Sequence, residues 1–154
     1  HVLGFIMIDL DKILKEWQKD APIDILGLDD ASRKTPVLHG KYLEFLSHAK
    51  LEMKDAEFKQ KELMRKKFLW YNGKMTQAQL EREDWDPDPF NGLKIMKGDM
   101  HYYVESDPEL IKSEAKIHYH KTVIDTLKEI VDTIKWRHMV IKNIIENKKF
   151  EAGF

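Results

Sequence analysis

Basic and aromatic residues gather in one stretch of the sequence, and their types and spacing could bind a nucleic acid. Four cations recur at intervals of four and seven residues, which would place them on one ridge of a helix: Lys50, Lys54, Lys61 and Arg65. The following run, Arg65–Lys74, combines four cations with three aromatic rings. Cations neutralise phosphates and exposed rings stack on bases without reading sequence, so single-stranded nucleic acid suits this mixture. The candidate DNA contacts are Lys54, Lys61, Arg65, Lys66, Lys67, Trp70, Tyr71 and Lys74.

A solvated helix face is the simpler interpretation of the same cations, because a charge run needs no ligand. Cations near the C-terminal end of a helix also interact favourably with the helix dipole. Lys67, however, lies off the ridge and toward the apolar side, which a solvated face does not explain. Both interpretations stay open on the sequence pattern alone.

The net charge of -1 averages over segments of opposite charge. Residues 47–74 carry eight basic and four acidic side chains, whereas residues 75–114 carry four basic and ten acidic side chains. Local charge matters more to a polyanion than the total does. The basic segment is therefore the candidate interface, and the acidic one is expected to be a spacer or a protein-facing surface.

Several functional classes have no support in the 154 residues. There is no cysteine, which excludes disulfides and fits a reducing cytoplasm. No apolar run approaches the length of a membrane span, and no glycine-rich phosphate loop or nucleophile motif occurs. Asp84, Asp86 and Asp88 resemble the start of a calcium loop, but Pro89 and Ile95 replace its required glycine and glutamate. We expect no enzyme activity, no cofactor, no metal site and no membrane partner.

The sequence predicts a mainly α fold with two long helices and a short N-terminal helix. Apolar residues at helical spacing indicate the short helix at 8–19, ended by Pro22. Thr35-Pro36 has the pattern of an N-cap followed by the first helical residue, and Asn72-Gly73 that of a helix end, which predicts a long helix over 36–72. Residues 1–6 lack the basic region and length of a signal peptide, so we expect an unremarkable tail or added residues before a native start at Met7.

The middle of the chain is predicted to be irregular. Residues 75–84 suggest a helical turn or two, and two prolines and a glycine make Asp84–Gly92 a loop. Two short apolar runs, 93–96 and 101–104, predict a small β-hairpin. We therefore divide the chain into an N-terminal DNA-binding region, 7–106, with a variable loop and hairpin over 75–106, and a C-terminal region, 107–154.

Asp107-Pro108 predicts the start of a last helix that runs to about Phe150 and carries heptads. β-branched residues at position a with isoleucine at d favour assemblies above the dimer, so a homo-oligomeric ring or bundle is expected. The alternative is a hairpin in which this helix packs on the first long helix of its own chain. The expected oligomerisation residues are Ile117, Ile124, Leu127, Val131, Ile134, His138, Ile141 and Ile145.

Four short motifs occur in an order and at spacings typical of one phage protein family. Lys41-Tyr42-Leu43 enters the long helix, and the basic-aromatic run 65–74 ends it. Residues 134–144 and the C-terminal 150–153 follow, the last being the most specific local match. With these motifs the chain, from about Met7 onward, resembles the UvsY family, the recombination mediators of T-even and related phages.

The resemblance implies a non-enzymatic, phage-encoded protein that works in the cytoplasm of the bacterial host. Members of the family bind single-stranded DNA and assemble into closed rings through their C-terminal helices. They contact the phage's single-strand-binding protein and its RecA-like recombinase, and they help exchange the former for the latter during homologous recombination and repair. By residue, the family's two DNA-binding basic positions fall on Arg65 and Lys67, and its tyrosine pair on Trp70 and Tyr71.

The sequence departs from the family pattern in three places, which leaves partner specificity open. Leu69 stands where the family has an acidic residue, Trp70 replaces a tyrosine, and the loop Asp84–Gly92 is longer and different. Two other functional classes also remain. One is a helical oligomerisation scaffold without a nucleic-acid role, and the other is a helical, metal-dependent nuclease.

Overall fold

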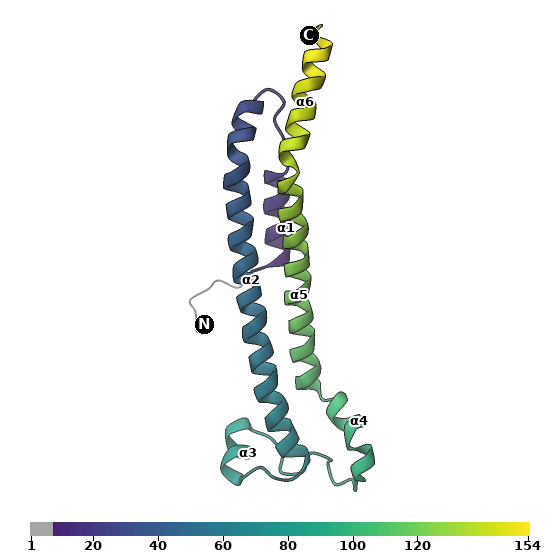
Figure 1. The fold of residues 1–154 in the computed structure, drawn as a ribbon. Coiled ribbons are helices and arrows are strands. Elements are labelled where there is room, and N and C mark those ends of the chain that lie inside the picture. Colours follow the sequence, from purple (N-terminus) through teal and green to yellow (C-terminus); the bar gives the residue numbers. More distant parts are fainter. Residues whose placement is uncertain (1–7) are drawn as a thin grey trace. The chain divides into compact units, whose positions relative to one another are not determined.

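The computed structural model describes residues 8–154 and is helical throughout its regular structure (Figure 1). Along the chain these helices are α1 (Leu10–Asp20), α2 (Leu28–Tyr71), α3 (Gln77–Glu83), the 3-10 turn η1 (Lys97–Asp99), α4 (Met100–Glu105), α5 (Pro108–Lys135) and α6 (Arg137–Glu151). The predicted mainly α fold is confirmed, and the predicted tail 1–6 lies outside the described residues. None of the described helices is long and apolar enough to cross a membrane.

The chain divides into two compact units. The first unit joins the residues up to Glu52 with His120–Phe154, and the second unit is Met53–Tyr119. Each of the two long helices, α2 and α5, contributes to both units. These bounds differ from the two regions expected from the sequence, 7–106 and 107–154, because each unit combines segments that are distant along the chain.

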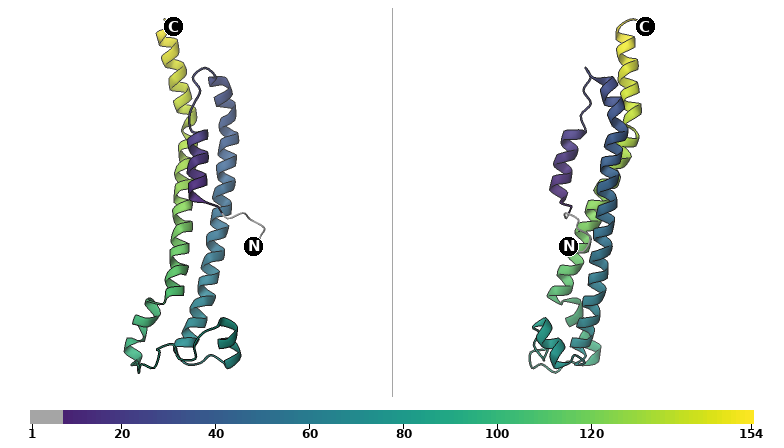
Figure 2. Two further views of the ribbon diagram at one scale, coloured as in Figure 1. Left: turned by 180° about the vertical axis from the view of Figure 1, so that it is seen from behind. Right: turned by 90° about the vertical axis from the view of Figure 1, so that its left-hand side faces the viewer.

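Helix α1 packs on the first part of α2 within the first unit (Figures 1 and 2). Asp9 caps α1 by accepting hydrogen bonds from the backbone N–H groups of Asp11 and Lys12. The Trp17 and Tyr42 rings meet edge to face, with their centroids 5.5 Å apart. The predicted helix 8–19 is therefore confirmed within two residues.

The start of α2 corrects the sequence prediction. The helix begins at Leu28 rather than at Pro36, and Pro36 lies inside it. The first turns carry the ion pairs Arg33–Asp29 and Lys34–Asp30, each 2.8 Å long and four residues apart, which suit a helix. Pro36 is exposed, so water can reach the carbonyl that its missing N–H leaves without a partner.

Other helix ends lie where local sequence signals place them. Gly73 follows α2 in the left-handed conformation, with φ of 66°, and the Lys74 N–H donates to the Leu69 carbonyl at 2.8 Å. A capping box between Thr76 and Gln79 begins α3. Asp107 Oδ1 accepts from the backbone N–H of Glu109 and of Leu110, which confirms the predicted start of α5 at Pro108.

The β-hairpin prediction is wrong. No strand occurs among residues 8–154, and the segment expected to form the second strand, 101–104, lies in α4. The apolar side chains Met100 and Val104 are four residues apart and therefore share one helix face, where they line a pocket. The single last helix is also corrected, because a turn at Trp136 separates α5 from α6.

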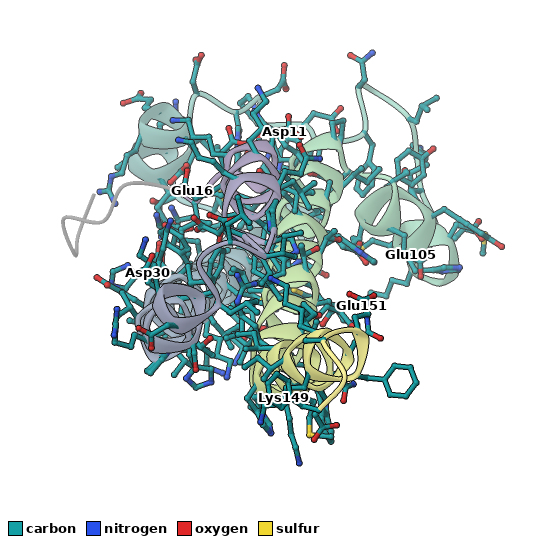
Figure 3. All side chains as sticks on the ribbon, turned by 90° about the horizontal axis from the view of Figure 1, so that it is seen from above. Asp11, Glu16, Asp30, Glu105, Lys149 and Glu151 are labelled. Carbon is teal, nitrogen blue, oxygen red and sulfur yellow. The ribbon has the colours of Figure 1, made fainter. Side chains whose placement is uncertain are left out.

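The apolar core of the first unit comes chiefly from α5. Seven of its side chains are buried: His120, Val123, Ile124, Leu127, Ile130, Val131 and Ile134. They share the interior with Ile13 of α1 and with Tyr42, Leu46 and Ala49 of α2. Side chains near the end of α6, among them Lys149 and Glu151, instead point outward (Figure 3).

Candidate nucleic-acid interface

One face of α2 in the second unit carries exposed cations. Lys54 keeps 62% of its side chain exposed, although its Nζ lies 3.4 Å from Glu57 Oε2. Lys61 and Arg65 follow on the same side of the helix and are exposed, as is Lys74 just beyond the helix end. Among the described residues, none of the ion pairs found involves Lys61, Arg65 or Lys74. These four of the predicted DNA contacts are accessible to a ligand.

Lys66 is held by an acidic residue from the segment that follows α2. Its Nζ lies 2.7 Å from Glu83 Oε1 of α3, and its side chain is 40% exposed. The pair keeps Lys66 beside α3, but solvent still reaches it. Lys66 is therefore only partly available for contact with a phosphate.

Lys67 lies in the interior of the second unit, contrary to the expectation of an accessible cation. Only 3% of its side chain is exposed, and its Nζ lies 3.1 Å from Asp107 Oδ2 and 3.3 Å from Glu109 Oε1. The same nitrogen lies over the rings of Trp70 and Trp85, 4.5 Å and 4.1 Å from their centroids. Two carboxylates and two ring faces thus replace the water around the ammonium, which makes its burial tolerable.

Tyr71 is buried beside Lys67 and donates its hydroxyl hydrogen to Asp107 Oδ2 at 2.6 Å. Burial acts to raise the pKa of Asp107, but hydrogen bonds from Tyr71, the Leu110 backbone and Lys67 outweigh burial and hold that pKa below its ordinary value. Burial and the bond to Asp107 both raise the pKa of Tyr71. Asp107 is therefore an anion whose charge is balanced locally.

Trp70 is half-buried and contacts the acidic loop. Its indole N–H donates to the Asp86 carbonyl at 2.6 Å, and its ring centroid lies 4.9 Å from that of Tyr71 and 5.2 Å from that of Trp85. Trp85 in turn donates its indole N–H to Glu109 at 3.1 Å. The two rings that the sequence predicted as a base-stacking platform thus pack mainly against other parts of the same unit.

The eight predicted contacts consequently fall into two groups. Lys54, Lys61, Arg65 and Lys74 face solvent, whereas Lys66, Lys67, Trp70 and Tyr71 contact the acidic segment 75–114. A direct DNA contact by Lys67 or Tyr71 would require their bonds to Asp107 to open, so for this pair DNA contact stays a prediction. Sequence reasoning missed the partners Trp85, Asp107 and Glu109. The opposite charges of the two segments were the available signal for that pairing.

The predicted oligomerisation stripe is largely buried within its own chain. Five of its residues lie in the core of the first unit: Ile124, Leu127, Val131, Ile134 and Ile141. Ile117 is half-buried, while His138 and Ile145 are exposed. The intramolecular packing that the sequence left open is therefore present for most of the stripe. Large exposed apolar side chains remain on and beside α6: Trp136, Met139, Val140, Ile145, Phe150 and Phe154.

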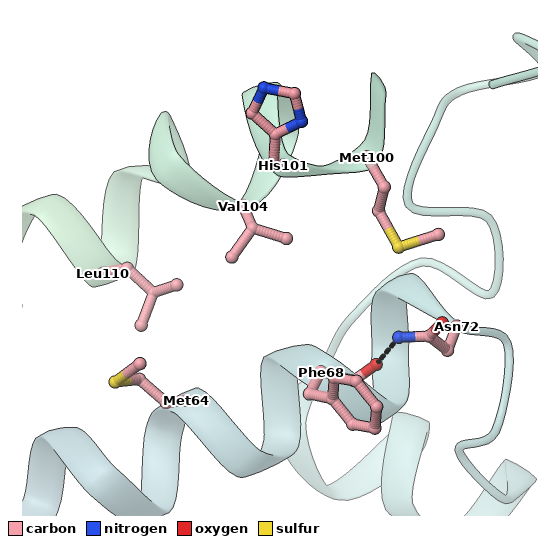
Figure 4. Close-up of a pocket in the computed structure, with 7 residues that line it drawn as sticks. All are labelled: Met64, Phe68, Asn72, Met100, His101, Val104 and Leu110. Carbon is pink, nitrogen blue, oxygen red and sulfur yellow. Dashed lines mark hydrogen bonds between the residues drawn. The ribbon is translucent and has the colours of Figure 1, made fainter. Parts of the chain in front are cut away.

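An apolar pocket of about 340 Å³ opens beside the C-terminal end of α2 (Figure 4). Its lining comes from α2, α4 and α5 and from the residue that follows α2: Met64, Phe68, Asn72, Met100, His101, Val104 and Leu110. The Asn72 side-chain amide donates to the Phe68 carbonyl at 2.7 Å, which fixes one rim of the pocket. No group of three or more metal-ligating side chains occurs in the described part of the chain.

Comparisons with known proteins agree on one family. The family described as "Recombination, repair and ssDNA binding protein UvsY" matches residues 16–154. The recombination protein uvsY of Enterobacteria phage T4 is 26% identical over 144 residues, which covers 94% of this chain and 98% of the relative.

Solved structures show a similar fold. One crystal structure of the bacteriophage T4 recombination mediator protein UvsY has a TM-score of 0.76 and 23% identity, over 95% of this chain and 99% of that chain. Another, from a different crystal lattice, has a TM-score of 0.74 and 25% identity, over 91% and 98%.

Proposed function

The chain belongs to the UvsY family of recombination, repair and single-stranded-DNA-binding proteins, and on this premise we propose that it is a recombination mediator. It binds single-stranded DNA as a homo-oligomer and promotes loading of a RecA-like recombinase in exchange for single-strand-binding protein. It acts without catalysing a reaction itself. Because the T4 relative is a phage protein, we place this activity in the cytoplasm of an infected bacterium.

The exposed cations of α2 are the observation that supports DNA binding most strongly. Lys54, Lys61 and Arg65 lie on one side of the helix in the second unit, and Lys74 lies just beyond its end. Phosphates attract such a row without regard to base sequence, because each neutralised phosphate releases counterions. A mediator has to act on any strand, so binding that does not depend on sequence suits this role.

The buried cluster around Lys67 supports the interface indirectly. Lys67, Trp70 and Tyr71 bind the loop 84–92 and the start of α5 to the end of α2. This arrangement supports the C-terminal end of the cationic face. We propose that these residues position the interface, and that they meet DNA only where the bonds to Asp107 open.

Self-association is proposed through α6, because most of the α5 stripe is used within the chain. Trp136 at the N-cap of α6 and Val140 and Phe150 within it fall on one side at helical spacing, and they expose 65%, 47% and 80% of their surface. Isolated exposed apolar residues are ordinary, but a row along one helix face is typical of an interface. Several copies would let one strand meet several weak sites together, which raises avidity.

The test of the mediator role is recombinase assembly on covered DNA. Single-stranded DNA is first saturated with the phage single-strand-binding protein, and recombinase ATPase activity is then followed with and without this protein. The measured quantity is the lag before ATPase activity reaches its steady rate. We expect the wild-type protein to shorten this lag and Lys61→Ala/Arg65→Ala to leave it long. The variant Lys112→Ala/Lys116→Ala removes the same charge from exposed positions on α5 and should act like wild type.

Three outcomes would contradict the proposal, and each points elsewhere. If the protein binds DNA but does not change the lag of the recombinase, it is a DNA-binding protein and not a mediator. Absence of any DNA binding by a folded oligomer would favour the scaffold. Degradation of the strand in magnesium or manganese would favour the nuclease.

A further inference from the structure

Two phenylalanine rings lie exposed among the cations of the α2 face. Phe58 and Phe68 expose 54% and 58% of their surface. With Lys54, Lys61 and Arg65 they follow one another at intervals of four, three, four and three residues. At about 100° per residue these five side chains fall within one narrow strip of the helix. The second unit therefore presents rings and cations together on one surface.

Phe58 lies between two of the cations. Lys54 Nζ is 5.7 Å and Lys61 Nζ is 5.9 Å from the ring centroid, so both ammonium groups approach the ring that separates them. A phosphate bound by either lysine would bring its attached base close to Phe58. The ring is half-exposed, so a base could reach it without any change in the fold of the unit.

Phe68 has a second feature, because its ring forms part of the wall of the apolar pocket described above (Figure 4). The pocket of about 340 Å³ is large enough for a planar base. Arg65 lies three residues earlier on the same strip and is exposed, so a phosphate can be neutralised one helical turn from the pocket. A strand whose phosphates follow the cations could therefore insert a base into the apolar pocket beside Phe68.

Trp70 and Tyr71 are less suited to this task. The hydroxyl of Tyr71 and the indole N–H of Trp70 already bond to Asp107 and Asp86. The two rings also pack on each other, and Trp70 packs on Trp85. Stacking of a base requires a free ring face. Phe58 and Phe68 expose more than half of their surface, and among the described residues none of the ring–ring contacts found involves either of them. A base that stacks on Phe58 would displace the lysine ammonium groups from the ring and leave them to its own phosphates.

We propose that Phe58 and Phe68 are the base-stacking residues of this protein, and that the Phe68 pocket takes one base of a single strand whose phosphates follow Lys54, Lys61 and Arg65. This inference rests on the proposed DNA binding and specifies which rings perform it. The ligand is single-stranded nucleic acid without sequence preference, because every base has a face that can stack. A second protein covering the same rings is the competing explanation.

The test compares oligo(dT) with an oligonucleotide of the same length in which abasic sites replace the thymines, so that phosphates remain and bases do not. Binding is followed by fluorescence anisotropy for wild type, Phe58→Leu, Phe68→Leu and the double variant. Leucine keeps apolar bulk but cannot stack. Each lost stacking contact is expected to weaken oligo(dT) binding by roughly 5- to 150-fold. Binding of the abasic oligonucleotide should be weak for wild type and equally weak for the variants.

The controls separate this inference from the proposed function. Leu93→Ala and Met96→Ala remove exposed apolar side chains of the second unit that are not part of the strip, and these variants should bind oligo(dT) like wild type. Circular dichroism and sedimentation must show unchanged helicity and assembly size.

If the leucine variants bind oligo(dT) like wild type while Lys61→Ala/Arg65→Ala binds poorly, the stacking assignment is wrong and DNA binding stands. If a phenylalanine variant loses affinity only because the oligomer dissociates, the rings form a protein interface, and the assignment is again wrong. If wild type does not bind oligo(dT), both fail.

Discussion

The Tyr71 hydroxyl donates a 2.6 Å hydrogen bond to Oδ2 of Asp107, which joins the end of α2 to the start of α5. The other oxygen of Asp107 caps α5, and Oδ2 also faces Lys67 Nζ at 3.1 Å. One carboxylate therefore connects a helix start, a helix end and a buried cation. Through Trp70 and Trp85 the same cluster reaches the acidic loop.

Tyr71→Phe should destabilise the protein without affecting its surface. The change removes a buried hydrogen bond to a charged group, which typically costs about 1.5–3 kcal/mol. Urea unfolding followed by circular dichroism measures the loss. Tyr102→Phe, at a 63% exposed position in the same unit, is the matched control and should have little effect. Equal stability of the Tyr71 variant and wild type would mean that the bond to Asp107 is not formed in solution.

Asp107→Asn should remove a pH-dependent part of the stability. Burial opposes ionisation of Asp107, but its hydrogen bonds outweigh burial and lower its pKa in the folded protein. Its charge therefore stabilises the fold fully above the unfolded-state pKa, and this contribution is lost as pH falls through the lower, folded-state pKa. We expect the gap in unfolding free energy between wild type and Asp107→Asn to be constant from pH 7 to about 5 and to close at lower pH. Asparagine is also a good N-cap, so the variant can keep the cap of α5 while it loses the charge and the second acceptor oxygen, which faces Tyr71 and Lys67. A gap that widens on acidification would contradict the assignment.

Lys67→Met should lower the free energy of unfolding strongly, while the DNA affinity of the molecules that remain folded should change little. The variant leaves the Asp107 carboxylate buried without its ammonium partner, and breaking a buried pair typically costs about 3–5 kcal/mol. The double variant Lys67→Met/Asp107→Asn should recover part of that loss, because neither charge is then left alone. Denaturation and DNA binding are measured on the same samples. If the double variant is stable yet binds DNA at least tenfold more weakly, Lys67 reaches the strand and the original prediction from the family pattern is right.

Trp136→Ala/Phe150→Ala should give smaller assemblies that keep their helicity. Both rings are largely exposed, Trp136 at the N-cap of α6 and Phe150 on the helix, so removing them leaves the core of the first unit intact. Sedimentation velocity reports the assembly size and circular dichroism the helicity. Val37→Ala is the control, since Val37 is 70% exposed on α2. An unchanged sedimentation coefficient would exclude this face of α6 as the main contact between copies.

Sequence patterns predicted helix ends well where a short local signal fixes the backbone. Gly73 requires no partner elsewhere to adopt its left-handed conformation, and the Asp107 cap needs only the next three residues. Pro36 misled the prediction, because a proline tolerated inside an exposed helix has the same local pattern as one at a helix start. The ion pairs that favour the earlier start, Arg33–Asp29 and Lys34–Asp30, were visible in the sequence as four-residue spacings.

The sequence predicted where the cations lie along α2, but it did not predict which of the candidate side chains are exposed. The cationic face of α2 follows from helical periodicity, so Lys54, Lys61 and Arg65 were found from the sequence. The burial of Lys67 depends on Asp107, forty residues away, and no local pattern sets that pairing. The same holds for Trp70, whose partner Trp85 comes from a loop without a regular period.

The salt dependence of single-strand binding tests the central claim most directly. Affinity for oligo(dT) is measured across a range of salt concentrations for wild type, Lys61→Ala/Arg65→Ala and the control Lys112→Ala/Lys116→Ala. Each neutralised phosphate contributes a slope of roughly -0.7 to the plot of log affinity against log salt. We expect the Lys61/Arg65 variant to bind more weakly with a slope shallower by about 1.4, and the control to match wild type. Wild-type affinity and slope in the Lys61/Arg65 variant would show that the exposed face of α2 does not bind the strand.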